Sequence, residues 1–241
     1  MKKTFDYIIA GGGSAGCTLA SRLCENKNIE VLLIEAGGSG KSLFTQMPGG
    51  NGYIFGNPKF DWGFESVPQP SLNNRKILYP RGKGLGGSSL LNGMIYMRGA
   101  QGDFNRWRQK GLRGWSYEDV LPYFKKSASA LHRKEGKYHS HSGPLKLTAA
   151  GNYNEVDEAF INACVEAGSK INNDFYNESL NGVGRYDVKV WKGKRQSSAE
   201  AYLKIKPRNL TIYKNTSVIK ILFEKTKAIG LILSNGEVYA S

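Results

Sequence analysis

The sequence predicts an α/β protein that begins as a Rossmann-like, doubly wound parallel sheet. A short apolar segment at residues 7–10 ends in glycine, an amphipathic pattern of period 3.6 begins at Ser14, and a second apolar segment follows at residues 29–37. Short apolar segments of this kind are typical of parallel strands buried on both faces. The chain has 241 residues of which 40% are apolar, enough for a substantial core.

The helix expected from Ser14 has one apolar side, formed by Ala15, Leu19, Ala20 and Leu23. Further amphipathic helices are expected at residues 118–127 and 154–169, and alternating strands near residues 183–191 and 210–234.

Glycines between the first strand and the first helix follow a recognised spacing. Gly11, Gly13 and Gly16 give G-x-G-x-x-G in the strand–helix context that this motif requires. Gly11 permits a tight turn, Gly13 lets a pyrophosphate approach the backbone, and Gly16 allows close helix packing. The start of the helix adds free N–H groups and a partial positive charge.

Glu35 lies 19 residues after Gly16, at the end of the second predicted strand. A carboxylate at this place can bind ribose hydroxyls and disfavours a 2′-phosphate. The first segment therefore predicts a site for an adenine dinucleotide, either NAD or FAD; an ordinary tight turn between strand and helix is the alternative.

A second glycine-rich stretch, PRGKGLGGSSLLNGMIYMRG, occupies residues 80–99. Its glycines leave room for a ligand against the backbone, and Ser88 and Ser89 add short hydroxyl donors. We interpret it as a loop that covers the dinucleotide, with a glycine-rich surface loop as the alternative.

Several segments resemble the glucose–methanol–choline (GMC) family of FAD-dependent oxidoreductases, particularly its bacterial choline and alcohol dehydrogenases. They are DYIIAGGGSAGCTLASRL, LLIEAGG, PRGKGLGGSSLLNGMIYMRG and GWSYEDVLPYFKKS. Shorter similarities at residues 61–70, 141–147, 197–203 and 209–231 extend the resemblance over nearly the whole chain.

The resemblance implies FAD as the cofactor and a set of contact residues. The first glycine turn would line the diphosphate, Glu35 would bind the adenosine ribose, the second glycine loop would lie along the cofactor to its flavin end, and a strand backbone would contact adenine. In chain order the residues are Gly11, Gly13, Ser14, Ala15, Gly16, Glu35, Gly86, Gly87, Ser88, Asn92, Gly93, Met94, Ile95 and Val218. Some relatives hold FAD through a histidine where this chain has Leu91, so we expect non-covalent FAD.

The resemblance also implies a fold and its division. Residues 1–36 and about 195–241 would form Rossmann-like FAD-binding elements, and residues 37–125 a segment that covers FAD. Residues about 126–194 would begin an α+β substrate domain. The family's second signature and its catalytic histidine, with a histidine or asparagine partner, would lie beyond Ser241, so the C-terminal half of the family fold is expected to be absent.

The implied activity is oxidation of the CH–OH group of an alcohol or choline-type substrate, by hydride transfer to flavin. We name no catalytic residue, and the chain is expected to be a fragment of such an enzyme. A truncated, non-catalytic FAD-binding remnant is the alternative. Whether the enzyme would be an oxidase or a dehydrogenase, and its oligomeric state, stay open.

A net charge of +14 raises a third possibility, a basic nucleic-acid-binding protein. The cations are scattered in short doublets, so we expect a solvated surface and no nucleic-acid partner. The partner expected of the complete protein is a small-molecule alcohol.

Cys17, Cys24 and Cys164 form no CxxC pair, which favours a reducing, cytoplasmic location. No apolar stretch is long enough for a transmembrane segment. His132, His139 and His141 are interpreted as parts of a solvated loop, and no metal site is expected.

Overall fold

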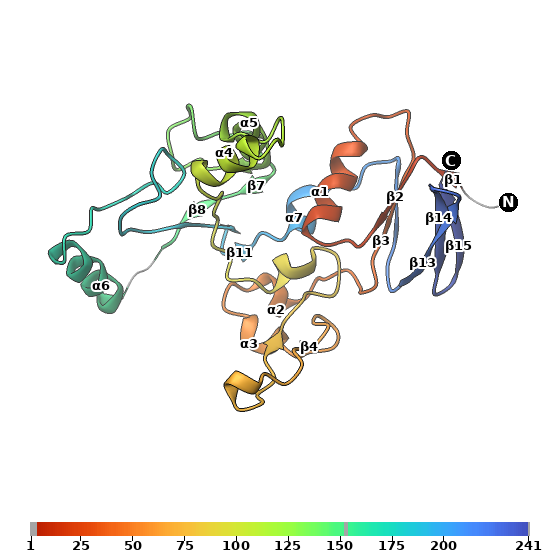
Figure 1. Cartoon of the computed structure of the whole chain (residues 1–241), viewed down its shortest axis with the longest axis horizontal. Helices are drawn as coiled ribbons and strands as arrows, with labels where there is room; N and C mark the ends of the chain where they lie inside the picture. Colours follow the sequence, from red (N-terminus) through yellow and green to blue (C-terminus); the bar gives the residue numbers. More distant parts are fainter. Residues whose placement is uncertain (1–3, 152–153, 241) are drawn as a thin grey trace. The chain divides into compact units, whose positions relative to one another are not determined.

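The computed structural model describes residues 4–151 and 154–240 and divides into two compact units (Figure 1). The first unit contains residues 1–93 and 193–241, and the second contains residues 94–192. Elements of the first unit are β1 (Thr4–Phe5), β2 (Tyr7–Ala10), α1 (Ser14–Leu23), β3 (Val31–Ile34), α2 (Leu43–Gln46), α3 (Asn51–Ile54), β4 (Phe64–Glu65), β5 (Leu78–Tyr79), β11 (Lys194–Arg195), α7 (Ser198–Tyr202), β12 (Leu210–Tyr213), β13 (Val218–Glu224), β14 (Lys227–Leu233) and β15 (Gly236–Ala240), with 3-10 turns at Pro70–Leu72 and Gly87–Leu90.

A parallel sheet of order β12-β3-β2 forms the centre of the first unit. Val31 of the central strand pairs with Tyr7 on one side and with Leu210 on the other. The predicted strand at residues 7–10 and the helix beginning at Ser14 are confirmed. The second predicted strand is confirmed over its apolar part, Val31–Ile34.

Strand β3 is buried on both faces because its side chains alternate between two cores. Val31 and Leu33 pack with Ala20 and Cys24 of α1. Leu32 packs on the opposite face in a core shared with Phe5, Ile34, Leu231 and Leu233. Full burial of one such aliphatic side chain stabilises the fold by roughly 1.5–3 kcal/mol.

Helices and strands therefore cover opposite faces of the parallel sheet. Figure 1 shows α1 and α7 on one face and the antiparallel strands β13, β14 and β15 on the other. The α/β class is confirmed. The carboxyl ends of β2 and β3 emerge between these layers, where ligands bind in open α/β sheets.

In the second unit, the described residues form three helices and several two-residue strands. They are α4 (Gln101–Gln109), α5 (Tyr117–Ser127), β6 (Ala128–Ser129), β7 (Leu145–Lys146), β8 (Thr148–Ala149), α6 (Glu155–Glu166), β9 (Asp187–Val188) and β10 (Val190–Trp191). The helices predicted at residues 118–127 and 154–169 correspond to α5 and α6. A small core combines Tyr96 and Tyr176 with Ala128, Ala130 and Leu147.

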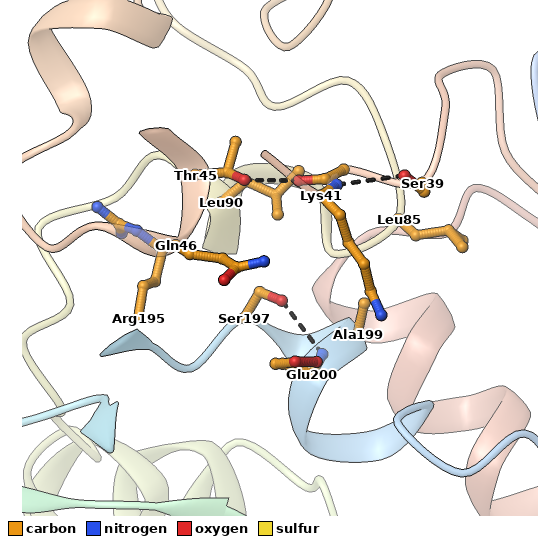
Figure 2. A pocket seen from close by; sticks show the side chains of 11 residues that line it. Ser39, Lys41, Thr45, Gln46, Leu85, Leu90, Arg195, Ser197, Ala199 and Glu200 are labelled. Carbon is orange, nitrogen blue, oxygen red and sulfur yellow. Dashed lines mark hydrogen bonds between the residues drawn. The ribbon is translucent and has the colours of Figure 1, made fainter. Parts of the chain in front are cut away.

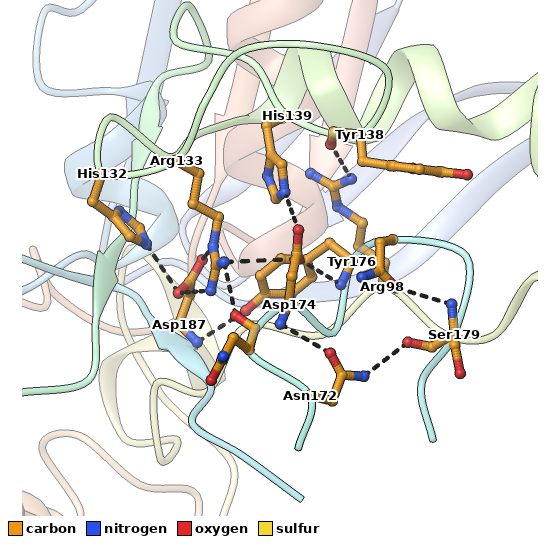
Figure 3. A network of polar contacts seen from close by, with 12 residues as sticks. Arg98, His132, Arg133, Tyr138, His139, Asn172, Asp174, Tyr176, Ser179 and Asp187 are labelled. Atoms are coloured by element: carbon orange, nitrogen blue, oxygen red, sulfur yellow. Dashed lines mark hydrogen bonds and ion pairs between the residues drawn. The ribbon is translucent and has the colours of Figure 1, made fainter. Parts of the chain in front are cut away.

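His132 and His139 belong to a network of polar contacts (Figure 3), and the interpretation of the histidines as parts of a solvated loop is wrong for His139, which is buried. His132 Nε2 lies 3.0 Å from Oδ1 of Asp187, a fully buried carboxylate that also accepts two 2.8 Å hydrogen bonds from Arg133. His139 is 7% exposed, and its Nε2 lies 2.7 Å from Asp174 Oδ2. The two carboxylates lie 35 or more positions away in the sequence, so only the fold reveals them as partners.

Hydrogen bonds to Asp187 hold the Arg133 guanidinium in the network and raise its pKa. Within the described ranges, no cluster of three or more His, Cys, Asp or Glu side chains is arranged to hold a metal ion. Among the same residues, no helix has both the length and the apolar character needed to cross a membrane.

Candidate functional site

A groove of about 410 Å³ opens at the carboxyl ends of β2 and β3. It contains residues from five separate parts of the first unit, all brought to one place by the sheet. The lining residues are Ala10, Gly11, Gly13, Ile34, Glu35, Ala36, Trp62, Gly82, Gly87, Thr216, Ser217 and Val218. Its volume lies within the range of small-molecule and cofactor pockets.

The first glycine turn forms one wall because it has no side chains to fill the space. Gly13 precedes α1 with extended backbone, and a Cβ added there would meet only Gly87 Cα, at 3.9 Å. A Cβ on Gly16 would instead lie 1.9 Å from the carbonyl oxygen of Gly11. Gly13 thus keeps the groove open, whereas Gly16 lets the helix pack against the turn.

The start of α1 is free to receive an anion. In this fully described helix no side chain caps the first N–H groups, and no acidic residue lies in the first turn. Ser14 and Ala15 are exposed there. Uncapped N–H groups together with the helix dipole favour a phosphate.

The second glycine loop lies directly against the first. Gly86 donates its N–H to the carbonyl of Gly12 at 2.8 Å. A Cβ on Gly87 would lie 2.6 Å from Gly13 Cα, so glycine is required for this approach. The two stretches that the sequence analysis assigned to one ligand are therefore in contact, although about seventy residues separate them.

Glu35 connects these glycine segments through both of its carboxylate oxygens. Oε2 accepts the N–H of Gly12 at 2.8 Å, and Oε1 accepts those of Gly37 and Gly84 at 2.8 and 2.9 Å. The side chain is 6% exposed and lines the groove. Since a carboxylate has about four lone-pair positions, one remains for a ligand hydroxyl.

Sequence reasoning missed several groove residues. Thr216 and Ser217 lie next to Val218, the predicted adenine contact, and the Thr216 N–H donates to the Glu35 carbonyl at 3.0 Å. Trp62 and Gly82 complete the wall. Trp62 falls in the 61–70 segment used for the resemblance, but nothing in its local pattern distinguishes it.

The remaining predicted residues do not line this groove. Ser88 accepts the N–H of Gly82 through Oγ at 3.1 Å, a hydrogen bond within the second glycine loop. Gly93 is exposed. Met94 and Ile95 belong to the second unit, where Ile95 is paired with Val188.

Asn92 is held by a buried cation, Arg195, which is 2% exposed. One guanidinium nitrogen of Arg195 donates to the Asn92 backbone carbonyl and, at 3.3 Å, to its side-chain oxygen. The other donates to Asn51 Oδ1 at 2.5 Å and to the Pro48 carbonyl at 3.3 Å. Burial lowers the pKa of Arg195.

A small pocket of about 30 Å³ lies beside Arg195 (Figure 2). Leu85 and Leu90 of the second glycine loop contribute to its wall, together with Thr45 and Ser197. Arg195 therefore fixes the end of the glycine loop at Asn92, a role that no local sequence signal reveals.

Cys17 lies under the first glycine turn but has no reactive character. Its thiol donates to the Gly12 carbonyl at 3.0 Å. Burial raises its pKa to about 11, so the thiol stays protonated at neutral pH. Cys17, Cys24 and Cys164 are all free thiols.

The donor set fits a dinucleotide. Side-chain-free backbone and an uncapped helix start suit a diphosphate, Glu35 suits a ribose hydroxyl, and the backbone at Val218 suits an adenine edge. Of the predicted residues, the structure brings Gly11, Gly13, Glu35, Gly87 and Val218 together around the groove. Their contact with a cofactor stays a prediction.

Comparison with known proteins gives a consistent result. Residues 5–239 match the family described as GMC oxidoreductase. The chain is 41% identical over 250 aligned positions to oxygen-dependent choline dehydrogenase of Photobacterium profundum, covering 100% of this chain and 44% of that protein. The enzyme of the same name from Vibrio vulnificus is 42% identical, with 96% and 42% covered.

Solved structures share the fold. Pyridoxine 4-oxidase from Mesorbium loti superposes with a TM-score of 0.92 at 30% identity, covering 98% of this chain and 48% of that one. An FAD-dependent oxidoreductase from Chaetomium thermophilum gives 0.89 at 30% identity, with 99% and 44% covered. The chain thus spans less than half the length of these relatives.

Proposed function

The chain belongs to the GMC oxidoreductase family, and from that premise we propose that its groove binds FAD as the nucleotide-binding portion of an oxidoreductase that acts on alcohols. The observation that carries the proposal is the contact between the two glycine segments. The Gly12 carbonyl accepts the Gly86 N–H, and both segments border the same 410 Å³ groove.

Each part of FAD has a matching group in this proposal. Gly11 to Gly16 receive the diphosphate, Glu35 accepts a hydrogen bond from the adenosine ribose, and the Val218 backbone contacts adenine. Gly86, Gly87 and Ser88 lie along the cofactor, and the segment from Asn92 to Ile95 passes its flavin end. Bound FAD would supply the acceptor for the hydride of an alcohol.

Non-covalent binding follows from the side chain at position 91. Leu91 is 4% exposed and packs with Ile54 and Phe60. An aliphatic side chain has no nucleophile for a bond to the flavin, so the groove must retain the cofactor by hydrogen bonds and packing alone.

A choline-type alcohol is the substrate class we propose for the complete protein, because the curated relatives at 41–42% identity are choline dehydrogenases. In that protein residues 37–125 would cover FAD and residues about 126–194 would begin the substrate domain. Three free thiols favour a cytoplasmic location.

Absorbance spectroscopy tests the proposal directly. We expect the purified chain to bind FAD stoichiometrically, to show the flavin bands near those of free FAD, and to release the flavin on denaturation. A folded protein that is colourless and does not bind added FAD would contradict the proposed site. Flavin binding without reduction by choline would limit the function of this chain to holding the cofactor.

A further inference from the structure

Three backbone N–H groups at the beginning of the second glycine loop are bound by side-chain oxygens. Arg81 donates its N–H to Asp61 Oδ1 at 2.9 Å, Gly82 donates to Ser88 Oγ at 3.1 Å, and Gly84 donates to Glu35 Oε1 at 2.9 Å. Two of the three acceptors are buried carboxylates from distant parts of the chain.

Each carboxylate gathers amides from three segments. Glu35 accepts from Gly12 and Gly37 in addition to Gly84. Asp61, 2% exposed, accepts from Gly56 at 2.9 Å and Gly63 at 3.1 Å in addition to Arg81. Hydrogen bonds to an ionised acceptor are stronger than neutral ones, and losing the acceptor leaves these N–H groups without it.

A loop of this composition needs such anchors. Gly86 and Gly87 have φ angles of +106° and +52°, which glycine adopts readily. Glycine also loses the most conformational freedom on ordering, so fixing the backbone of this loop has a large entropic cost. Without fixed acceptors, a ligand would have to supply this ordering free energy when it binds.

We propose that Glu35 and Asp61 are positioning residues that hold the loop of residues 81–87 in its binding conformation before FAD arrives. The predicted effect on FAD affinity rests on the proposed function, whereas the predicted order of the loop in the FAD-free chain does not. Glu35 then has two roles, because it also lines the groove and keeps acceptor capacity for a ligand hydroxyl.

Hydrogen exchange in the FAD-free chain tests loop order without any substitution. We expect the amides of Gly12, Gly37, Gly84 and Arg81 to exchange at least tenfold more slowly than the amide of the exposed Gly49. Equal rates would overturn the proposal, and this result does not depend on whether any variant folds or on whether FAD binds.

Substitutions separate positioning from ribose binding. Glu35→Gln should accelerate exchange at Gly12, Gly37 and Gly84, and Asp61→Asn should do so at Arg81. Glu30→Gln, a charge-matched change at an exposed site, should leave exchange unchanged. Both loop variants should bind FAD and its 2′,3′-dideoxyadenosine analogue at least tenfold more weakly than wild type binds each.

Two outcomes would overturn the positioning role. One is weaker FAD binding by Glu35→Gln with unchanged amide exchange, which would leave only a ribose contact. The other is an affinity loss confined to FAD and absent for the dideoxy analogue. If wild type keeps its protected amides but binds no FAD, the proposed function fails and the loop anchoring stands.

Discussion

Replacing Gly13 with valine should weaken FAD binding while the chain keeps its fold. Gly13 has φ −76° and ψ −161°, which a residue with a side chain can adopt. The added Cβ meets only Gly87 Cα at 3.9 Å, an ordinary van der Waals contact. The new methyl groups would therefore occupy groove space that the proposed diphosphate needs.

The size of the effect follows from these contacts. Exchanging glycine for a poorer residue at the start of a helix costs roughly 1 kcal/mol of stability. Forcing extra methyl groups into a filled site costs about 1–3 kcal/mol, and each 1.36 kcal/mol is tenfold in an equilibrium constant. We expect the dissociation constant of FAD to rise about 5- to 150-fold, toward the upper limit for valine.

Flavin fluorescence quenching measures the affinity, and circular dichroism during heating measures the fold. Gly49→Val is a matched control because a Cβ there has no heavy atom within 4 Å and Gly49 lies outside the groove. Gly16→Ala is the opposite control, since its Cβ would lie 1.9 Å from the Gly11 oxygen and should disrupt folding. A folded Gly13→Val protein with wild-type affinity would refute the placement of the diphosphate.

Three further predictions concern buried groups of the same chain. Burial opposes ionisation of Asp61, but hydrogen bonds from backbone N–H groups outweigh burial and hold its pKa below the usual 3.8. The ionised Asp61 therefore stabilises the fold fully above pH 3.8, and this contribution is lost as the pH falls through the lower folded-state pKa. In urea titrations, the unfolding free energies of wild type and Asp61→Asn should converge in acid. A difference that stays constant with pH would contradict this. Burial raises the pKa of Cys17 to about 11, so this thiol should react with a thiol reagent at pH 8 only when the protein unfolds. The more exposed Cys164 should react first. Simultaneous labelling of both thiols in the native protein would count against the structure. Arg195→Lys should lower the free energy of unfolding by roughly 1–3 kcal/mol, because one ammonium group cannot reproduce the two guanidinium nitrogens that bind Asn92 and Asn51. An unchanged urea midpoint would show that these paired contacts are dispensable.

Local order of residues was enough to predict the first half of the site. Gly11, Gly13 and Gly16 lie between a strand and a helix, and Glu35 ends the next strand. This strand–turn–helix–strand unit depends on short connections and on side-chain periodicity, and both can be read from consecutive residues. The glycines and serines of residues 80–99 indicated a loop that covers the ligand, and the family resemblance added its individual contact residues and Val218.

Only the tertiary structure revealed which groups meet across the chain. Gly87 approaches Gly13, Asp61 accepts the N–H of Arg81, and Arg195 holds Asn92 over a separation of 103 positions. The histidine near Asp174 was misinterpreted for the same reason, because a polar local sequence does not show whether a distant carboxylate will cover it.

The sequence by itself determined the strand–turn–helix–strand unit and the chemistry that its glycines and glutamate can offer. Tertiary structure decided that the second glycine loop contacts the first and that buried carboxylates anchor it. The physical reason is that steric and periodic constraints act between neighbouring residues, whereas burial and hydrogen-bond partnership depend on how separate segments pack.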